Sequence, residues 1–229
     1  MAVNRLTSMR ALSNAHTQEG GKPPLCVGVN SNAPPEKIKK GVSVKYAHDP
    51  NKKWHVLRVT YHREQKAFDY LLSMGLQVYM PMQYSIRTEN GRKHRIKTPL
   101  IPNILFVYTE PETINQHIKG KFSVSFITYY YNHFQKLPDG KNPPLVVPYH
   151  DMMNFIRVTA TDNEHVRMVQ PHQCHYKGGE KVRVVDGDFA GVVGRVARVS
   201  GQQRVVVELE GVCLVSTAYI PTAFLRKME

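Results

Sequence analysis

Hydrophobic and polar residues alternate with a period of two along the last quarter of the chain. Val182 and Val184 alternate with charged neighbours, and the alternation resumes at Val192 after a stretch rich in glycine. This period is typical of strands that bury one face. The strands are short and closely spaced, which predicts a small β-barrel over residues 177–229. The predicted strands lie at residues 181–184, 192–199, 204–209 and 212–215.

The turn between the first two of these strands combines glycine, aspartate and one aromatic residue. Aspartate and glycine favour turns because they tolerate the backbone angles that turns require. We therefore interpret this group as turn and bulge residues and not as a phosphate cradle. Its members are Asp186, Gly187, Phe189, Gly191 and Gly194.

Residues 53–160 mix both periods, which predicts an α+β domain with an antiparallel sheet flanked by helices. Gly75 is expected to end the first helix, and Pro111 to begin the second. Residues 161–176 are polar and show no apolar period, which predicts a linker. Residues 1–52 show neither period and read as a mobile basic extension. The predicted elements are strands at 54–60, 77–82, 101–108 and 123–130, helices at 64–74, 111–118 and 148–158, and a hairpin at 84–98.

The predicted hairpin turns at Asn90-Gly91, the strongest short turn signal in the chain. Its cations can reach a phosphate backbone, so we interpret them as contacts to nucleic acid, with an exposed solvated loop as the alternative. The nucleic-acid candidates are Arg87, Arg92, Lys93, His94, Arg95 and Lys97. A second candidate group, of aromatic and cationic residues, begins the first helix and could stack on an unpaired base. It consists of Tyr61, His62, Arg63 and Lys66, for which an ordinary helix start is the alternative.

Charge and composition narrow the class of protein. The net charge is +13, and residues 53–160 carry 14 lysines and arginines against 7 acids, whereas residues 177–229 carry 8 against 6. An anionic partner is expected for the first domain and a protein partner for the barrel. No apolar run is long enough to cross a membrane or to serve as a signal sequence, so a cytoplasmic protein is expected.

Cysteine and histidine occur together near residue 174. Cys174 lies between His172 and His175, but the fourth zinc ligand would have to be His165, in the predicted linker. The three cysteines are far apart along the chain, so no disulfide framework is expected. The sequence shows no catalytic triad, Walker loop or dinucleotide loop. We expect no cofactor, no metal and no enzymatic activity.

Two segments resemble known motifs. "GEKVRVVDGDFAGVVGRV" resembles the KOW motif, and "TAYIPTAFL" looks like the close of the same module in the NusG family of transcription elongation factors. Upstream, "KKWHVLRVTYHREQKAFDYLLSMGLQVYMPM" and "TPLIPNILFVYTE" resemble the NusG amino-terminal domain in order and spacing. The resemblance implies such a domain at 53–160, followed by an SH3-like KOW barrel. The layout is closest to specialised antiterminators of the UpxY type, which belong to capsular polysaccharide operons.

The resemblance also implies partners and a mechanism. In the NusG family, apolar side chains on the strand at 101–108 grip RNA polymerase, which points to Ile101, Ile104 and Phe106 as the polymerase-binding residues. Ile104 replaces the tyrosine common in that motif, and the alternative is that these residues are core. The expected protein is a monomer that closes the polymerase clamp and suppresses pausing or premature termination.

The resemblance implies further partners as well. Upstream or non-template DNA, and also nascent RNA, would lie at the first domain, and a ribosomal or termination factor would bind the barrel. The rival function is a ribosome-associated RNA-binding protein, which would need a more basic barrel.

Overall fold

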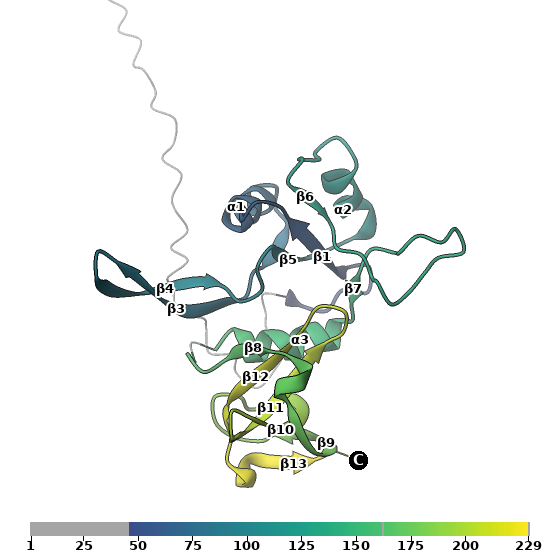
Figure 1. The fold of residues 1–229 in the computed structure, drawn as a ribbon. Coiled ribbons are helices and arrows are strands. Elements are labelled where there is room, and N and C mark those ends of the chain that lie inside the picture. The colour runs from purple at the N-terminus through teal and green to yellow at the C-terminus, as the bar shows by residue number, and fades with distance from the viewer. Residues whose placement is uncertain (1–45, 162, 229) are drawn as a thin grey trace, which may run out of the picture. The chain divides into compact units, whose positions relative to one another are not determined.

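A computed structural model describes residues 46–161 and 163–228, so residues 1–45 of the predicted extension lie outside it. The described chain has a mixed α/β fold that is rich in sheet, as predicted at this level (Figure 1). In chain order, the elements are β1 (Lys53–Val59), α1 (Glu64–Ser73), β2 (Gln77–Tyr79), β3 (Met82–Glu89), β4 (Arg92–Pro99), β5 (Ile104–Thr109), α2 (Pro111–Ile118), β6 (Ile127–Tyr129), β7 (Val146–Val147), α3 (Tyr149–Thr159), β8 (Arg167–Val169), η2 (Pro171–Gln173), β9 (His175–Val184), β10 (Val193–Val199), β11 (Gln202–Leu209), β12 (Cys213–Tyr219), η3 (Thr222–Phe224) and β13 (Leu225–Lys227).

The first sheet has β5 and β1 at its centre. Its strand order is β2-β5-β1-β6, with the short β7 also paired to β1, and all pairings are antiparallel. Side chains of β1 and β5 alternate between two hydrophobic clusters, one on each face of the sheet. Ala67 and Leu71 of α1 and Ile114 of α2 cover one face, whereas Met152 and Phe155 of α3 belong to the cluster on the other. Both faces of the central strands are therefore covered, as expected for strands rich in apolar residues throughout.

The last residues of the predicted extension belong to this fold. Tyr46 is buried and packs edge-on against Trp54, with the ring centroids 5.0 Å apart. The hydroxyl of Tyr149 in α3 donates a hydrogen bond to the Tyr46 carbonyl oxygen at 2.6 Å. The backbone N–H of Asp49 donates to the Tyr108 hydroxyl at 2.9 Å. The compact part of the chain thus begins several residues before the predicted boundary at 53.

Strands β3 and β4 form a separate two-stranded ribbon that projects from the first sheet (Figure 1). Asn90 and Gly91 connect them, with φ angles of 50° and 74°. Two consecutive positive φ angles define a type I′ turn, which matches the twist of a hairpin and favours the Asn-Gly pair. The pairing runs without a bulge from Met82 opposite Pro99 to Glu89 opposite Arg92. The predicted hairpin is confirmed.

A second sheet, the C-terminal sheet, is formed by β8 to β13. Its strand order is β13-β9-β10-β11-β12-β8, with antiparallel pairing throughout. Strand β8 lies within the stretch 161–176 that was expected to be a linker, and β9 begins at His175, before the expected start of the barrel at 177. Gly194 permits the close approach of β10 to β11, because a Cβ there would meet the Val206 carbonyl oxygen at 2.5 Å.

Helix α3 is joined to the C-terminal sheet by one buried side chain. The Asn154 amide donates to the Val193 carbonyl oxygen at 2.6 Å and accepts from the Val193 N–H at 2.8 Å. These two bonds reproduce the pairing that a neighbouring strand would give Val193. Apolar residues of α3 and of the C-terminal sheet, such as Phe155 and Val205, belong to one cluster. Hydrogen bonds and apolar packing together hold α3 against this sheet.

Candidate nucleic-acid interface

The cations of the β3–β4 ribbon lie on its two opposite faces. Residues paired across an antiparallel ribbon point to the same side, so the observed register assigns each cation to a face. Lys93, Arg95 and Lys97 lie opposite Thr88, Ile86 and Tyr84, and these six residues form what we call the tyrosine face. The other face carries Arg87, Arg92 and His94. All six candidate residues are exposed, so the predicted cations are accessible but do not form a single patch.

On the tyrosine face, cations gather over one aromatic ring. The Arg95 guanidinium lies 3.7 Å from the centroid of the Tyr84 ring, and the Lys97 ammonium lies 5.1 Å from it. A cation over the face of an aromatic ring is attracted by the electrons of the ring. Arg95 also forms an ion pair with Glu164, at 3.4 Å between Nη2 and Oε2. Arg95 is thus held between a ring on its own ribbon and a carboxylate from the segment after α3.

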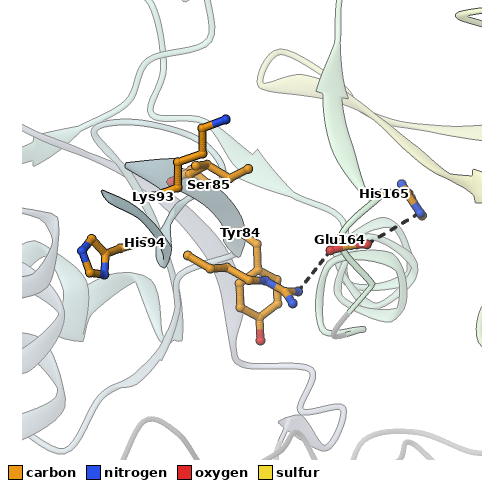
Figure 2. Close-up of a pocket in the computed structure, with 8 residues that line it drawn as sticks. Tyr84, Ser85, Lys93, His94, Glu164 and His165 are labelled. Carbon is orange, nitrogen blue, oxygen red and sulfur yellow. Dashed lines mark ion pairs between the residues drawn. The ribbon is translucent and has the colours of Figure 1, made fainter. Parts of the chain in front are cut away.

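A cavity of about 370 Å³ lies between the ribbon and residues Glu164 and His165. Arg95 reaches across to Glu164 in an ion pair, and Figure 2 shows His94 pointing away from Glu164 and His165. The imidazole Nε2 of His165 lies 4.0 Å from Glu164 Oε1. The cavity therefore combines cationic groups with one carboxylate and one aromatic ring.

The opposite face of the ribbon is simpler. Arg87 forms an exposed ion pair with Glu89, the one acid of the hairpin, at 3.2 Å between Nε and Oε1. Exposed pairs of this kind contribute at most about 1 kcal/mol, so Arg87 stays available to a phosphate group. Arg92 and His94 extend the cationic surface beside it. This face suits contact with a phosphate backbone without recognition of bases.

The second candidate group, at the start of α1, is brought together around Phe126. The Arg63 guanidinium lies 5.5 Å from the Tyr61 ring and 5.7 Å from the Phe126 ring, and the Lys66 ammonium lies 5.3 Å from the latter. Tyr61 is 81% exposed. Tyr61 and His62 both adopt positive φ angles, 59° and 52°, which are uncommon outside glycine. The structure thus places an exposed aromatic ring on an unusual turn, next to Arg63 and to Lys66 of α1.

A buried carboxylate holds this turn in place. Glu64 is buried, and its Oε1 accepts a hydrogen bond from the Asn103 N–H at 2.8 Å. The His62 Nδ1 lies 3.7 Å from the same oxygen. Asn103 itself has a φ of 62°, so two unusual turns meet at one carboxylate. Backbone strain of this kind is stored where the surrounding structure enforces it, often at functional sites.

The three residues expected to contact polymerase are buried. Ile101, Ile104 and Phe106 all belong to the cluster between the first sheet and α3, and Phe106 is fully buried. The ring centroids of Phe106 and of Phe155 in α3 lie 5.6 Å apart. The expectation of an exposed apolar patch on this strand is therefore corrected. Alternation along β5 is real, but α3 covers the face that was interpreted as open.

The glycine-rich turn of the C-terminal sheet fits its structural interpretation. Phe189 is buried and packs into the same cluster, so its ring is part of the core. Gly187 and Gly191 adopt φ angles of 80° and 88°, where a side chain would be strained. The Asp186 side chain accepts from the Gly187 N–H at 2.8 Å. These residues shape the turn, which the Gly191 N–H closes by donating to the Val184 carbonyl oxygen at 2.7 Å.

Three residues at the two candidate surfaces escaped prediction. Tyr84 could have been found, because a two-residue turn at Asn90-Gly91 places it opposite Lys97. Glu164 and Phe126 could not, since each reaches its cations only through tertiary packing.

Within 46–161 and 163–228, no group of three histidine, cysteine, aspartate or glutamate side chains is arranged to hold a metal ion. In the same ranges, no helix is both long and apolar enough to span a membrane.

Comparison with known proteins finds a family match over the residues that carry both candidate surfaces. No curated protein matches the chain. Residues 52–155 match the family model described as "Transcription termination factor nusG". The matched range includes the first sheet, the ribbon and the turn at Tyr61. Residues 52–155, just under half of the chain, are therefore similar to the NusG family.

Proposed function

We propose that the protein is a non-enzymatic transcription elongation factor that binds RNA polymerase and contacts nucleic acid exposed in the transcription complex. The observation that carries the proposal is the exposed cationic ribbon on a domain that matches the NusG family. Factors of this family generally bind RNA polymerase. A projecting ribbon with cations on both faces can follow a phosphate backbone while the rest of the domain contacts protein.

The turn at the start of α1 supplies a second contact in this proposal. Tyr61 offers an exposed ring for stacking on an unpaired base, and Arg63 and Lys66 offer cations for its phosphate. Stacking on an aromatic side chain tolerates any base, because every base has a π-face. The ribbon and this turn would together hold an unpaired strand, suppress pausing and keep the polymerase clamp closed.

We do not assign the polymerase contact to Ile101, Ile104 and Phe106, because α3 covers them in this structure. The finer parts of the proposal rest on the sequence resemblance. These are operon-specific antitermination of the UpxY type and recruitment of a second protein by a KOW barrel. The small charge excess of residues 177–229 supports a protein partner there.

The test has two arms on an assembled elongation complex. The first arm asks whether the full-length protein co-purifies with RNA polymerase and shortens pauses. The second compares the parent with a triple variant, Arg92→Ala, Lys93→Ala and Arg95→Ala, across a salt titration. We expect polymerase association to persist while the salt dependence flattens by roughly one unit per lost phosphate contact. An unchanged slope with unchanged pausing would reduce the ribbon to a solvated loop.

A further inference from the structure

The cavity beside the ribbon contains a group that phosphate binding does not explain. Glu164 places a carboxylate next to Arg95, on the face of the ribbon that also carries Lys93 and Lys97. A carboxylate repels phosphate, so its presence there weakens a purely electrostatic surface. Bases, unlike phosphates, carry N–H groups that a carboxylate can accept from.

The turn that carries Glu164 is held in place by three interactions. The His165 N–H donates to Asn163 Oδ1 at 3.0 Å, and the Val166 N–H donates to the Asn163 carbonyl oxygen at 3.2 Å. Nη1 of the buried Arg204, in β11, donates to the His165 carbonyl oxygen at 3.0 Å. Fixed backbone on both sides of Glu164 limits the positions that its carboxylate can reach. A preorganised acceptor of this kind is what specific recognition requires.

Arg95 has partners on both sides of its guanidinium. The guanidinium lies 3.7 Å from the centroid of the Tyr84 ring, and the ion pair with Glu164 places it beside the carboxylate. Both side chains remain about half exposed, at 54% and 57%, so a ligand can reach them. The cavity therefore offers a planar donor and a carboxylate acceptor side by side.

We propose that this cavity recognises an unpaired guanine in a nucleic-acid strand, an inference that rests on the proposed contact between the ribbon and nucleic acid. The Watson–Crick edge of guanine presents the O6 acceptor followed by two parallel donors, N1–H and N2–H. Arg95 would donate to O6, and the Glu164 carboxylate would accept from the two N–H groups, as in other paired charge-assisted bonds. Thymine and uracil present a single N–H between two carbonyl oxygens, which the carboxylate repels.

The size and charge of the cavity fit a single nucleotide. Its volume of about 370 Å³ lies at the lower end of the range for small-molecule sites. Lys93, exposed on the same face, can hold the adjoining phosphate. Base recognition at the cavity and phosphate contacts along the ribbon would then occur on one strand.

The experiment measures binding of full-length protein to fluorescent dodecamers by anisotropy, at one fixed salt concentration. The probes are dT12, the same strand with one central dG, dA or dC, and the U12 RNA counterparts, which separate DNA from RNA as the source of the guanine. The variants are Glu164→Gln and Arg95→Lys. The matched control is Glu210→Gln, which removes one exposed carboxylate from the turn between β11 and β12.

We expect the parent to bind the dG strand about fivefold or more tightly than dT12, since a bidentate base contact discriminates by at least that factor. Glu164→Gln should bind dT12 more tightly and lose the preference, because the repulsion and the paired acceptor both disappear. Arg95→Lys should lose the preference while it keeps its charge. The control should keep the preference.

Equal binding of all strands by the parent would overturn the proposal. So would a rise in affinity that is the same for every strand in Glu164→Gln and Glu210→Gln, because that result reflects charge alone. Failure of the proposed function would look different. In that case the parent would still prefer guanine, and Glu164→Gln would still lose this preference, but the parent would not co-purify with RNA polymerase.

Discussion

Strand β5 and the β3–β4 ribbon are neighbours in sequence but have opposite surroundings. Every residue of β5 is buried, with α1 and α2 on one face and α3 on the other. The outer half of the ribbon is exposed on both faces. The apolar surface that the resemblance implies for a partner is thus hidden, whereas the cationic surface is displayed. Binding through the ribbon needs no rearrangement, while binding through β5 would need α3 to move.

The largest expected difference between β5 and the ribbon is in the free energy of unfolding that is lost when a side chain is truncated. Phe106→Ala removes a fully buried ring that packs against Phe155, and should lower the free energy of unfolding by about 3–5 kcal/mol. The control Ile86→Ala truncates a side chain on the ribbon that is 73% exposed, and should change the free energy of unfolding by less than about 0.5 kcal/mol. Urea denaturation measures both. Similar small losses in the two variants would mean that β5 is not the buried centre of the fold.

The next largest effect is on binding and reverses the roles of the two regions. The triple variant of Arg92, Lys93 and Arg95 should lose about a hundredfold in affinity for single-stranded DNA near 0.1 M salt, if each cation neutralises one phosphate. Its stability should stay close to that of the parent, since these side chains are exposed. Anisotropy titrations and urea denaturation test the two halves of this expectation. A destabilised variant with normal binding would contradict it.

A smaller effect tests how α3 is kept over β5. Asn154→Ala removes both hydrogen bonds to Val193 and leaves the Val193 N–H and carbonyl oxygen buried without these partners. This change should lower the free energy of unfolding by about 2–3 kcal/mol. Asn51→Ala, at an exposed site, is the matched control and should be nearly neutral. Hydrogen exchange at the Val193 amide should also accelerate in Asn154→Ala. Unchanged exchange there would show that the side chain does not protect this amide.

The smallest expected effect is a dependence of the free energy of unfolding on pH, which two buried histidines cause. Burial lowers the pKa of His55 in β1, and of His117 in α2, below the usual 6.5. As the pH falls through 6.5, the unfolded chain takes up protons that the folded chain resists, so stability is lost on acidification. His55→Leu should flatten this loss between pH 7.5 and 5.5, and the double variant with His117→Leu should flatten it further. Urea midpoints across that range provide the measurement, and an unaltered slope in both variants would refute the expectation.

The sequence was a good guide where a local signal decides the structure. The Asn90-Gly91 turn fixes the hairpin and its register, and Pro111 begins α2 at the predicted residue. It was a poor guide where tertiary packing decides. The alternation along β5 separates two faces but cannot say that α3 covers the one with Phe106. Strand β8 has three residues and is defined by its pairing with β12, so residues 161–176 gave no strand signal.

The two-residue turn of the ribbon limits how this ribbon can vary in length. Because each strand alternates between faces, adding one residue to β3 alone would move every side chain beyond it to the opposite face. Adding one residue to each strand would restore the pairing but exchange the tyrosine face and the Arg87 face beyond the insertion. Insertions of two residues in each strand lengthen the ribbon and keep every side chain on its present face. Homologues that keep both surfaces should therefore differ in ribbon length by multiples of four residues.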